Sequence, residues 1–114
     1  MGYDTRFTLK VDTGGDVAKQ IKAHQALSEC DEARYCLQIG KHDREFYECN
    51  EPGHWYKYDE DMRRISAEIT GVLFTLTGDG EERKDIWQAF YLNGKGYHEK
   101  AVVTLLPFNK KKLT

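Results

Sequence analysis

Apolar and polar residues alternate along several short stretches of the chain, and this period-two pattern predicts β-strands. The alternation is clear over 7–11 and over 35–39, and further strands are predicted over 45–49, 72–77, 86–92 and 101–106. The aromatic stretch 54–58 is predicted to be extended and to resume the strand that starts at 45. Because the stretch 72–77 opens with three consecutive apolar residues, its strand is predicted to lie in the centre of the sheet.

Two other stretches carry apolar residues at helical spacing. Asp16 is predicted to cap the first helix and Asp59 the second, since a carboxylate accepts the free N–H groups of a first turn. Gly71 suits the end of the second helix. The apolar faces consist of Val17, Ile21 and Leu27 in the first helix and of Met62, Ile65 and Ile69 in the second.

The predicted order of elements is β-α-β-β-α-β-β-β, which is an α+β fold. The first six elements match the ferredoxin-like, or split βαβ, arrangement of an antiparallel sheet with two helices on one face. Asn93-Gly94 predicts a tight turn, so the last two strands form an extra C-terminal hairpin at one sheet edge. The chain has no linker, so 1–114 is predicted to be a single domain, with 108–114 as a frayed tail.

The bulk composition excludes some functions. The 17 Lys and Arg residues nearly balance the 19 Asp and Glu residues, giving a formal net charge of −2. General nucleic-acid binding is disfavoured, because it usually needs a clear basic surplus. The chain contains neither a signal-peptide pattern nor a run of about 18 apolar residues, which predicts a cytoplasmic protein without a membrane span.

The most suggestive polar segment is the loop over 78–85, in which two glycines alternate with acidic residues. Asp79, Glu81, Glu82 and Asp85 could ligate a hard cation, but their spacing does not match a calcium-binding loop. Presentation of these acids to a basic partner surface is the stronger interpretation, and a plain solvated loop is the simplest. We therefore predict no metal site.

Cysteines and histidines cluster between 30 and 54 without the spacing of a zinc site. Cys30, Cys36 and Cys49 are predicted to be reduced thiols. The sequence carries none of the phosphate-binding, dinucleotide-binding, zinc-protease or nucleophile-elbow motifs. We expect no catalytic residues and no cofactor, although an enzyme acting on a small molecule such as a nucleotide, through His54, Asp79 and Glu81, stays open.

The aromatic residues have two interpretations. Trp55 and Tyr91 could supply buried area to a partner protein, or they could pack in the core. Aromatic rings on a free sheet face could also stack on RNA bases, but the fixed register of basic, glycine and aromatic residues seen in RNA-recognition sheets is missing.

Several motifs of the C-terminal half occur together in a known group of proteins. The stretch 55–62 reads WYKYDEDM, the stretch 73–82 reads LFTLTGDGEE, and Asp85-Ile86-Trp87 and Asn93-Gly94-Lys95 follow. This pattern resembles a group of small proteins encoded by phages and prophages. The resemblance implies a phage gene and an α+β sheet fold.

These observations favour a non-enzymatic binding protein that contacts a host bacterial protein, and inhibition of a bacterial defence system is one outcome that the resemblance implies. The partner-binding residues would be Asp79, Glu81, Glu82 and Asp85 together with Trp55 and Tyr91. Self-association into a homodimer through an edge strand is the remaining alternative.

Overall fold

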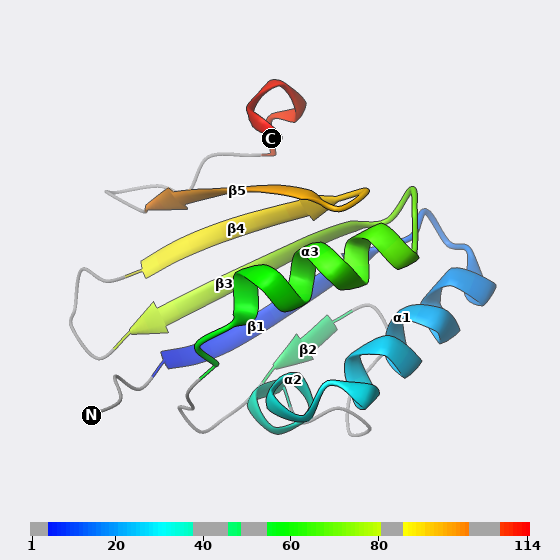
Figure 1. The fold of residues 1–114 in the computed structure, drawn as a ribbon, viewed down its shortest axis with the longest axis horizontal. Helices are drawn as coiled ribbons and strands as arrows, with labels where there is room; N and C mark the ends of the chain where they lie inside the picture. Colours follow the sequence, from blue (N-terminus) through cyan, green and yellow to red (C-terminus); the bar gives the residue numbers. More distant parts are fainter. Residues whose placement is uncertain (1–4, 38–45, 49–54, 81–85, 101–107) are drawn as a thin grey trace.

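A computed structural model describes residues 5–37, 46–48, 55–80, 86–100 and 108–114. The fold is α+β (Figure 1). Its elements in chain order are β1 (Thr5–Asp12), α1 (Val17–Glu29), α2 (Asp31–Leu37), β2 (Phe46–Glu48), α3 (Tyr58–Glu68), β3 (Leu73–Gly80), β4 (Ile86–Leu92), β5 (Lys95–Lys100) and the 3-10 turn η1 (Lys110–Lys112).

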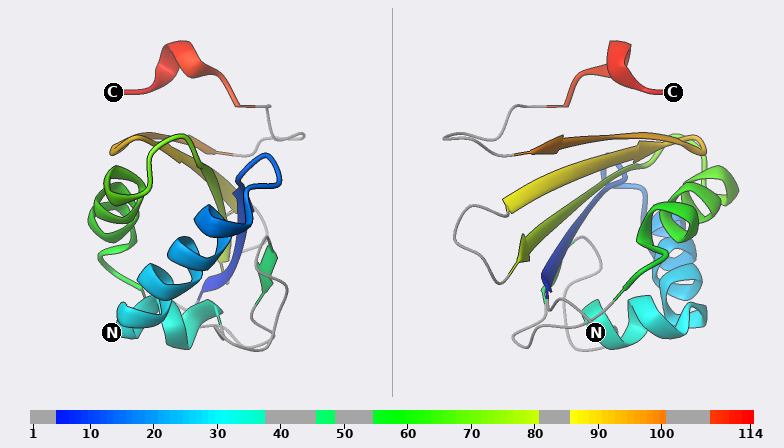
Figure 2. Two further views of the ribbon diagram at one scale, coloured as in Figure 1. Left: turned by 90° about the vertical axis from the view of Figure 1, so that its right-hand side faces the viewer. Right: turned by 60° about the vertical axis from the view of Figure 1, so that its left-hand side comes forward.

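The strands form one sheet in the order β2-β1-β3-β4-β5, and every neighbouring pair is antiparallel. The three α-helices lie on one side of this sheet (Figure 2). The α+β class and the antiparallel sheet are therefore as the sequence predicts, whereas the described residues form three α-helices on one face where two were predicted. The strand over 72–77 is confirmed as an inner strand, since β3 lies between β1 and β4.

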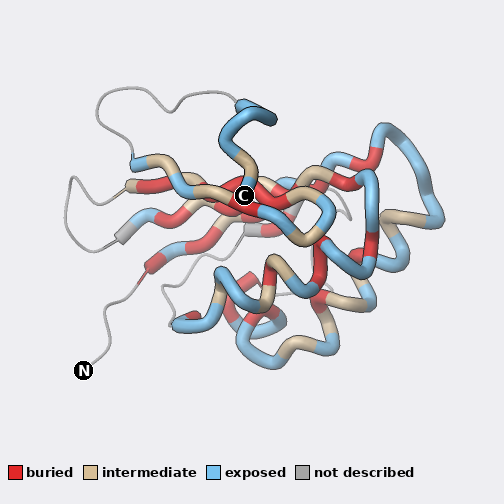
Figure 3. The backbone as a smooth tube through the Cα atoms, turned by 45° about the horizontal axis from the view of Figure 1, so that its top comes forward, coloured by how far each residue is buried: buried red, intermediate tan, exposed pale blue. Residues whose placement is uncertain are grey.

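The core lies between the sheet and the helices, and buried residues alternate with less buried ones along the strands (Figure 3). In β1 the residues Phe7, Leu9 and Val11 are almost fully buried, and the residues between them are not. Their partners across the ladder, Phe74 and Leu76, are also buried. The helices contribute Ala23 and Leu27 from α1, Ala33, Cys36 and Leu37 from α2, and Met62 and Ile65 from α3.

The strand predicted over 35–39 is wrong for residues 35–37, which belong to helix α2. Ala33, Cys36 and Leu37 are buried at helical spacing, whereas the Tyr35 side chain is 70% exposed. Residues 38 and 39 lie outside the described residues. A split βαβ arrangement requires a strand after the first helix at this point, so that finer prediction is not confirmed. The following strand does form, as β2, and pairs with β1.

The predicted C-terminal hairpin is confirmed as β4 and β5. Asn93 and Gly94 both have positive φ, at 54° and 82°, which is the backbone of a type I′ turn. The Asn93 side-chain oxygen also accepts the Gly71 N–H at 2.8 Å and so joins this turn to the end of α3. The strand that pairs with β4 is 95–100, whereas the prediction over 101–106 falls outside the described residues.

Helix α3 begins two residues earlier than predicted, with Lys57 rather than Asp59 at the cap position. Tyr56 and Lys57 form a turn and Tyr58 is already helical, so the extended stretch predicted over 54–58 is wrong for 56–58, while residue 54 lies outside the described part. Lys57 occupies the cap position without a side-chain hydrogen bond. Asp59 is therefore not the cap, and its carboxylate makes contacts with the sheet instead.

Candidate functional site

One face of the sheet points away from the helices, and we call it the outward face. It carries positions 6, 8, 10 and 12 of β1, 73, 75, 77 and 79 of β3, 86, 88, 90 and 92 of β4, and 95, 97 and 99 of β5. These positions alternate with the buried residues of the same strands, so their side chains stand on the opposite side. In the part of the chain that the structure describes, no α-helix covers this face (Figure 2).

The outward face mixes short polar and apolar side chains. Thr8, Thr77 and Gln88 are cross-strand neighbours in one row, and the Gln88 amide donates to the Thr77 hydroxyl at 3.4 Å. Leu73 and Ile86 are half-buried rather than buried. Partly exposed apolar residues among hydroxyl and amide groups occur in protein–protein contacts, whose rims are polar and solvent-accessible.

Segment 108–114 lies against part of this face and against the edge of the sheet. The Phe108 ring contacts Phe90 and Tyr97, with centroids 5.4 and 6.1 Å away. The Thr114 main-chain oxygen accepts the Gly96 N–H at 3.3 Å. The sequence predicts a frayed tail here, and the structure gives these residues defined contacts with β4 and β5.

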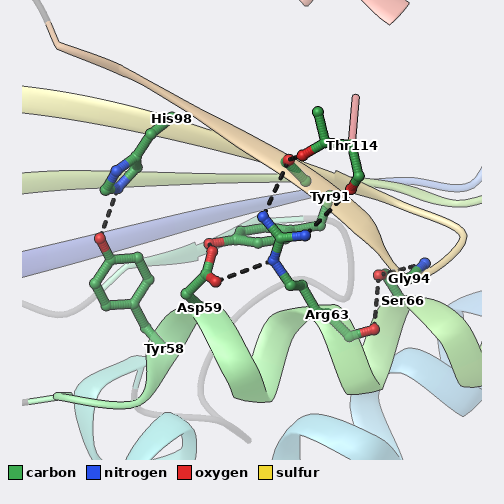
Figure 4. A network of polar contacts seen from close by, with 9 residues as sticks. Tyr58, Asp59, Arg63, Ser66, Tyr91, Gly94, His98 and Thr114 are labelled. Atoms are coloured by element: carbon green, nitrogen blue, oxygen red, sulfur yellow. Dashed lines mark hydrogen bonds and ion pairs between the residues drawn. The ribbon is translucent and has the colours of Figure 1, made fainter. Parts of the chain in front are cut away.

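On the side of the sheet that faces the helices, a polar network joins helix α3 to the β4–β5 hairpin (Figure 4). The Tyr91 hydroxyl donates to one oxygen of Asp59 at 3.0 Å, and Arg63 Nε donates to the other oxygen at 3.0 Å. The Arg63 guanidinium also donates to the main-chain oxygens of Gly96 and Thr114, at 3.1 and 3.2 Å. Burial and the Asp59 carboxylate both raise the pKa of Tyr91, so its hydroxyl stays a donor.

Next to this network, Tyr58 and His98 form a pair. The Tyr58 hydroxyl lies 2.6 Å from His98 Nε2, and the Tyr58 ring stacks on Trp87 with centroids 4.7 Å apart (Figure 4). Burial lowers the pKa of His98, nearby Asp59 opposes that shift, and Lys100 adds to it. A neutral His98 can accept the tyrosine hydrogen, which makes this pair a neutral contact across the sheet edge.

These polar groups have the geometry of structural contacts. Within the described residues, no buried side-chain nitrogen or oxygen lacks a hydrogen-bond partner. An open hollow of about 280 Å³ lies elsewhere, between α1 and α3, and is lined by Lys22, Gln25, Ala26, Glu29, Glu68 and Ile69. The Tyr58, Asp59, Arg63 and His98 side chains are absent from this lining, so the network does not converge on that hollow.

The structure places the predicted partner-binding residues in different environments. Asp79 is exposed at the end of β3, on the outward face. Glu81, Glu82 and Asp85 fall outside the described residues, so the acidic loop stays a prediction. The same holds for the enzyme alternative through His54, Asp79 and Glu81, because His54 and Glu81 are also outside the described part.

Trp55 and Tyr91 are core residues, which corrects their placement at a partner surface. Trp55 is 2% exposed and Tyr91 is 0% exposed. The Trp55 indole packs against Phe7 at 5.6 Å and donates its N–H to Asp61 at 2.8 Å. Both aromatic rings bury a large apolar area in the core of this 114-residue chain, and neither is accessible to a partner.

The two thiols within the described residues are sheltered, and Cys49 lies outside the described part. Cys36 is 1% exposed, and the Cys30 thiol donates to Asp61 at 3.5 Å. Burial is the main cause that raises the pKa of Cys30, which disfavours the reactive thiolate. Across the described ranges, no three His, Cys, Asp or Glu side chains are grouped so that they could hold a metal ion. No described helix is long and apolar enough to cross a membrane.

The lowered pKa of His98 predicts a pH dependence of stability. Since the folded protein binds the His98 proton less readily than the unfolded chain, stability is complete above the ordinary pKa of 6.5 and falls as the pH drops below it. We expect the free energy of unfolding, measured in urea from pH 8 to pH 5, to fall more steeply for the natural chain than for His98→Gln. The glutamine keeps an acceptor for Tyr58 but does not titrate. Parallel curves would contradict the prediction.

Comparison of the chain with protein-family models, with curated proteins and with solved structures finds no match. The functional interpretation therefore depends on the residues and contacts described above.

Proposed function

We propose that this chain is a non-enzymatic binding protein that contacts another protein through the outward face of its sheet. The observation that supports the proposal is one-sided burial. Helices cover one face, whereas on the other face Leu73 and Ile86 stay half-exposed among threonines. Burial of such residues by a partner is favourable at about 25 cal/mol per Å² of apolar surface.

The charges on this face favour a protein over a nucleic acid. Its basic residues Arg6, Lys10 and Lys95 are matched by the acidic residues Asp12, Asp79 and Glu99. At the outward positions of β1, β3, β4 and β5, three cations and three anions balance, which leaves no basic surplus there for a phosphate backbone. A balanced set of charges instead orients a protein partner that carries complementary pairs.

The partner that we propose is a host bacterial protein, in keeping with the resemblance of 55–95 to small phage proteins. Inhibition of a bacterial defence system is the consequence that we propose for this contact. Asp79 is exposed near the end of β3, and Glu81 and Glu82 follow after Gly80, the last residue of the strand. These acidic residues would extend the contact beyond the rim of the outward face.

Site-specific photo-crosslinking in bacterial cells tests the proposal. Thr77, in the middle of the outward face, is replaced by p-benzoylphenylalanine, and Gln25, exposed on α1, is replaced in a matched control. We expect a discrete crosslinked species from position 77 and only background from position 25. Identical patterns from both positions, or no product from position 77, would overturn the use of this face.

The same experiment examines the loop and the alternative of self-association. Charge reversal by Glu81→Lys and Glu82→Lys should lower the crosslink yield from position 77 several-fold if the loop contributes to binding. An unchanged yield would remove the loop from the contact. A product with twice the mass of the chain would identify a second copy as the partner and would replace the host protein in the proposal.

A further inference from the structure

Phe90 is buried for a reason that differs from the rest of the core. It is 3% exposed, yet it is not part of the core cluster, because it lies on the outward face of β4. Its ring is covered by Tyr97 of β5, 5.1 Å away, and by Phe108, 5.4 Å away. A residue of segment 108–112 therefore fills an aromatic site on the face that we propose for partner binding.

A second anchor holds the same segment. The Lys112 ammonium pairs with the Glu99 carboxylate, and this contact raises the pKa of Lys112. The Asn109 N–H donates to the Tyr97 hydroxyl oxygen. The Asn109 side chain accepts the Lys111 N–H at 3.0 Å and starts the turn η1, which brings the ring at 108 and the cation at 112 to their two sites together.

The segment is held by contacts that another chain could replace. Lys112 is exposed, and exposed ion pairs are weak and screened by salt. Phe108 is only partly buried. A partner segment that offers an aromatic ring and a cation can displace segment 108–112. The partner must bind tightly enough to compete with the high effective concentration of a segment tethered to the same chain.

We propose that Phe90, Tyr97 and Glu99 form a recognition site for a protein segment that carries an aromatic residue followed four residues later by lysine or arginine. Segment 108–112 occupies this site in cis and competes with the partner. This inference rests on the proposed function, because it names the chemistry of the partner that binds the outward face.

A peptide of residues 108–114, added to the isotope-labelled full chain, tests the site by NMR. In the Phe108→Ala/Lys112→Ala variant we expect saturable shifts of the Phe90, Tyr97 and Glu99 amides. The natural chain should need at least ten-fold more peptide, because its own segment competes. A peptide with alanine in place of its phenylalanine should cause no saturable shift. Absent shifts in the variant, or equal binding by both chains, would overturn the inference.

Two further measurements keep the result interpretable. The single variant Lys112→Glu serves as a substitute if the double variant does not fold. It repels Glu99 and leaves the aromatic ring of Phe108 unchanged, so it should also strengthen peptide binding. Crosslinking from position 77 is then repeated in the Phe108→Ala background, where we expect a higher yield. Peptide binding without any crosslink would retain the recognition site and reject the proposed function. A crosslink without peptide binding would reject the site and retain the function.

Discussion

Replacement of Gly78 by alanine is expected to destabilise the fold by about 2 to 3 kcal/mol. Gly78 in β3 lies opposite Trp87 in β4, and an added Cβ would come well inside 3.0 Å of three atoms of the indole ring. The indole cannot move aside easily, since it is stacked on Tyr58 and its ring centroid lies 4.9 Å from that of His98. The extra methyl group must therefore displace several rings at once.

Urea unfolding followed by tryptophan fluorescence measures this cost. Thr77→Ala is the matched control, because it is the neighbouring residue in the same strand and its side chain stands on the outward face. We expect the control to lose less than about 1 kcal/mol. A Gly78→Ala variant as stable as the control would contradict the prediction, because it would show that the rings of Trp87, Tyr58 and His98 can rearrange with no loss in the free energy of unfolding.

Glycine–aromatic pairs were the feature of the sheet that alternation of apolar residues could not reveal. Gly96 lies opposite Tyr91 in the same way, and an added Cβ there would overlap that ring. Strand β5 therefore presents a glycine and His98 toward the helices rather than aliphatic residues. Its polar sequence led to a strand prediction over 101–106, although the two-residue turn at Asn93-Gly94 already requires pairing to start at Lys95.

Helix α2 shows a second limit of short patterns. Alternation over 35–39 is too brief to separate a strand from a helix, because Cys36 and Leu37 also fit a helical face with Ala33. Asp31 and Glu32 in the first turn were the available signal for a helix. The longer patterns in α1, β1 and β3 had no such ambiguity, and those elements were predicted correctly. The predicted apolar face of α1 was wrong for Val17 and Ile21, which are exposed, because the helix buries Ala23 and Leu27 instead.

The candidate site was less predictable than the fold, because it depends on contacts between distant residues. Phe108 contacts Phe90 and Tyr97 because the chain folds back over the hairpin, and no local sequence pattern predicts that contact. Trp55 and Tyr91 have the residue types of partner anchors, and only their burial distinguishes core from surface. By contrast, the ion pair of Asp59 and Arg63 has a local signal, because side chains four residues apart in a helix are neighbours.

Removal of the Asp59 carboxylate tests that ion pair and its link to the sheet. In Asp59→Ala the hydroxyl of fully buried Tyr91 loses its acceptor, which should cost about 1 to 3 kcal/mol in the free energy of unfolding. Glu60→Ala is the matched control, since it removes the same charge from the same helix turn. That control should cost only the interaction with the helix dipole, about 0.3 to 1 kcal/mol.

A double-mutant cycle with Tyr91→Phe isolates the contact from the charge. In the phenylalanine background no hydroxyl is left without an acceptor, so Asp59→Ala should cost about 1 kcal/mol less than it does in the natural chain. Glu60→Ala should cost the same in both backgrounds, because the dipole is unchanged. An equal cost of Asp59→Ala in both backgrounds would mean that water replaces the carboxylate at Tyr91. Helix α3 would then be held to the hairpin by Arg63 and the apolar core rather than by the buried hydroxyl.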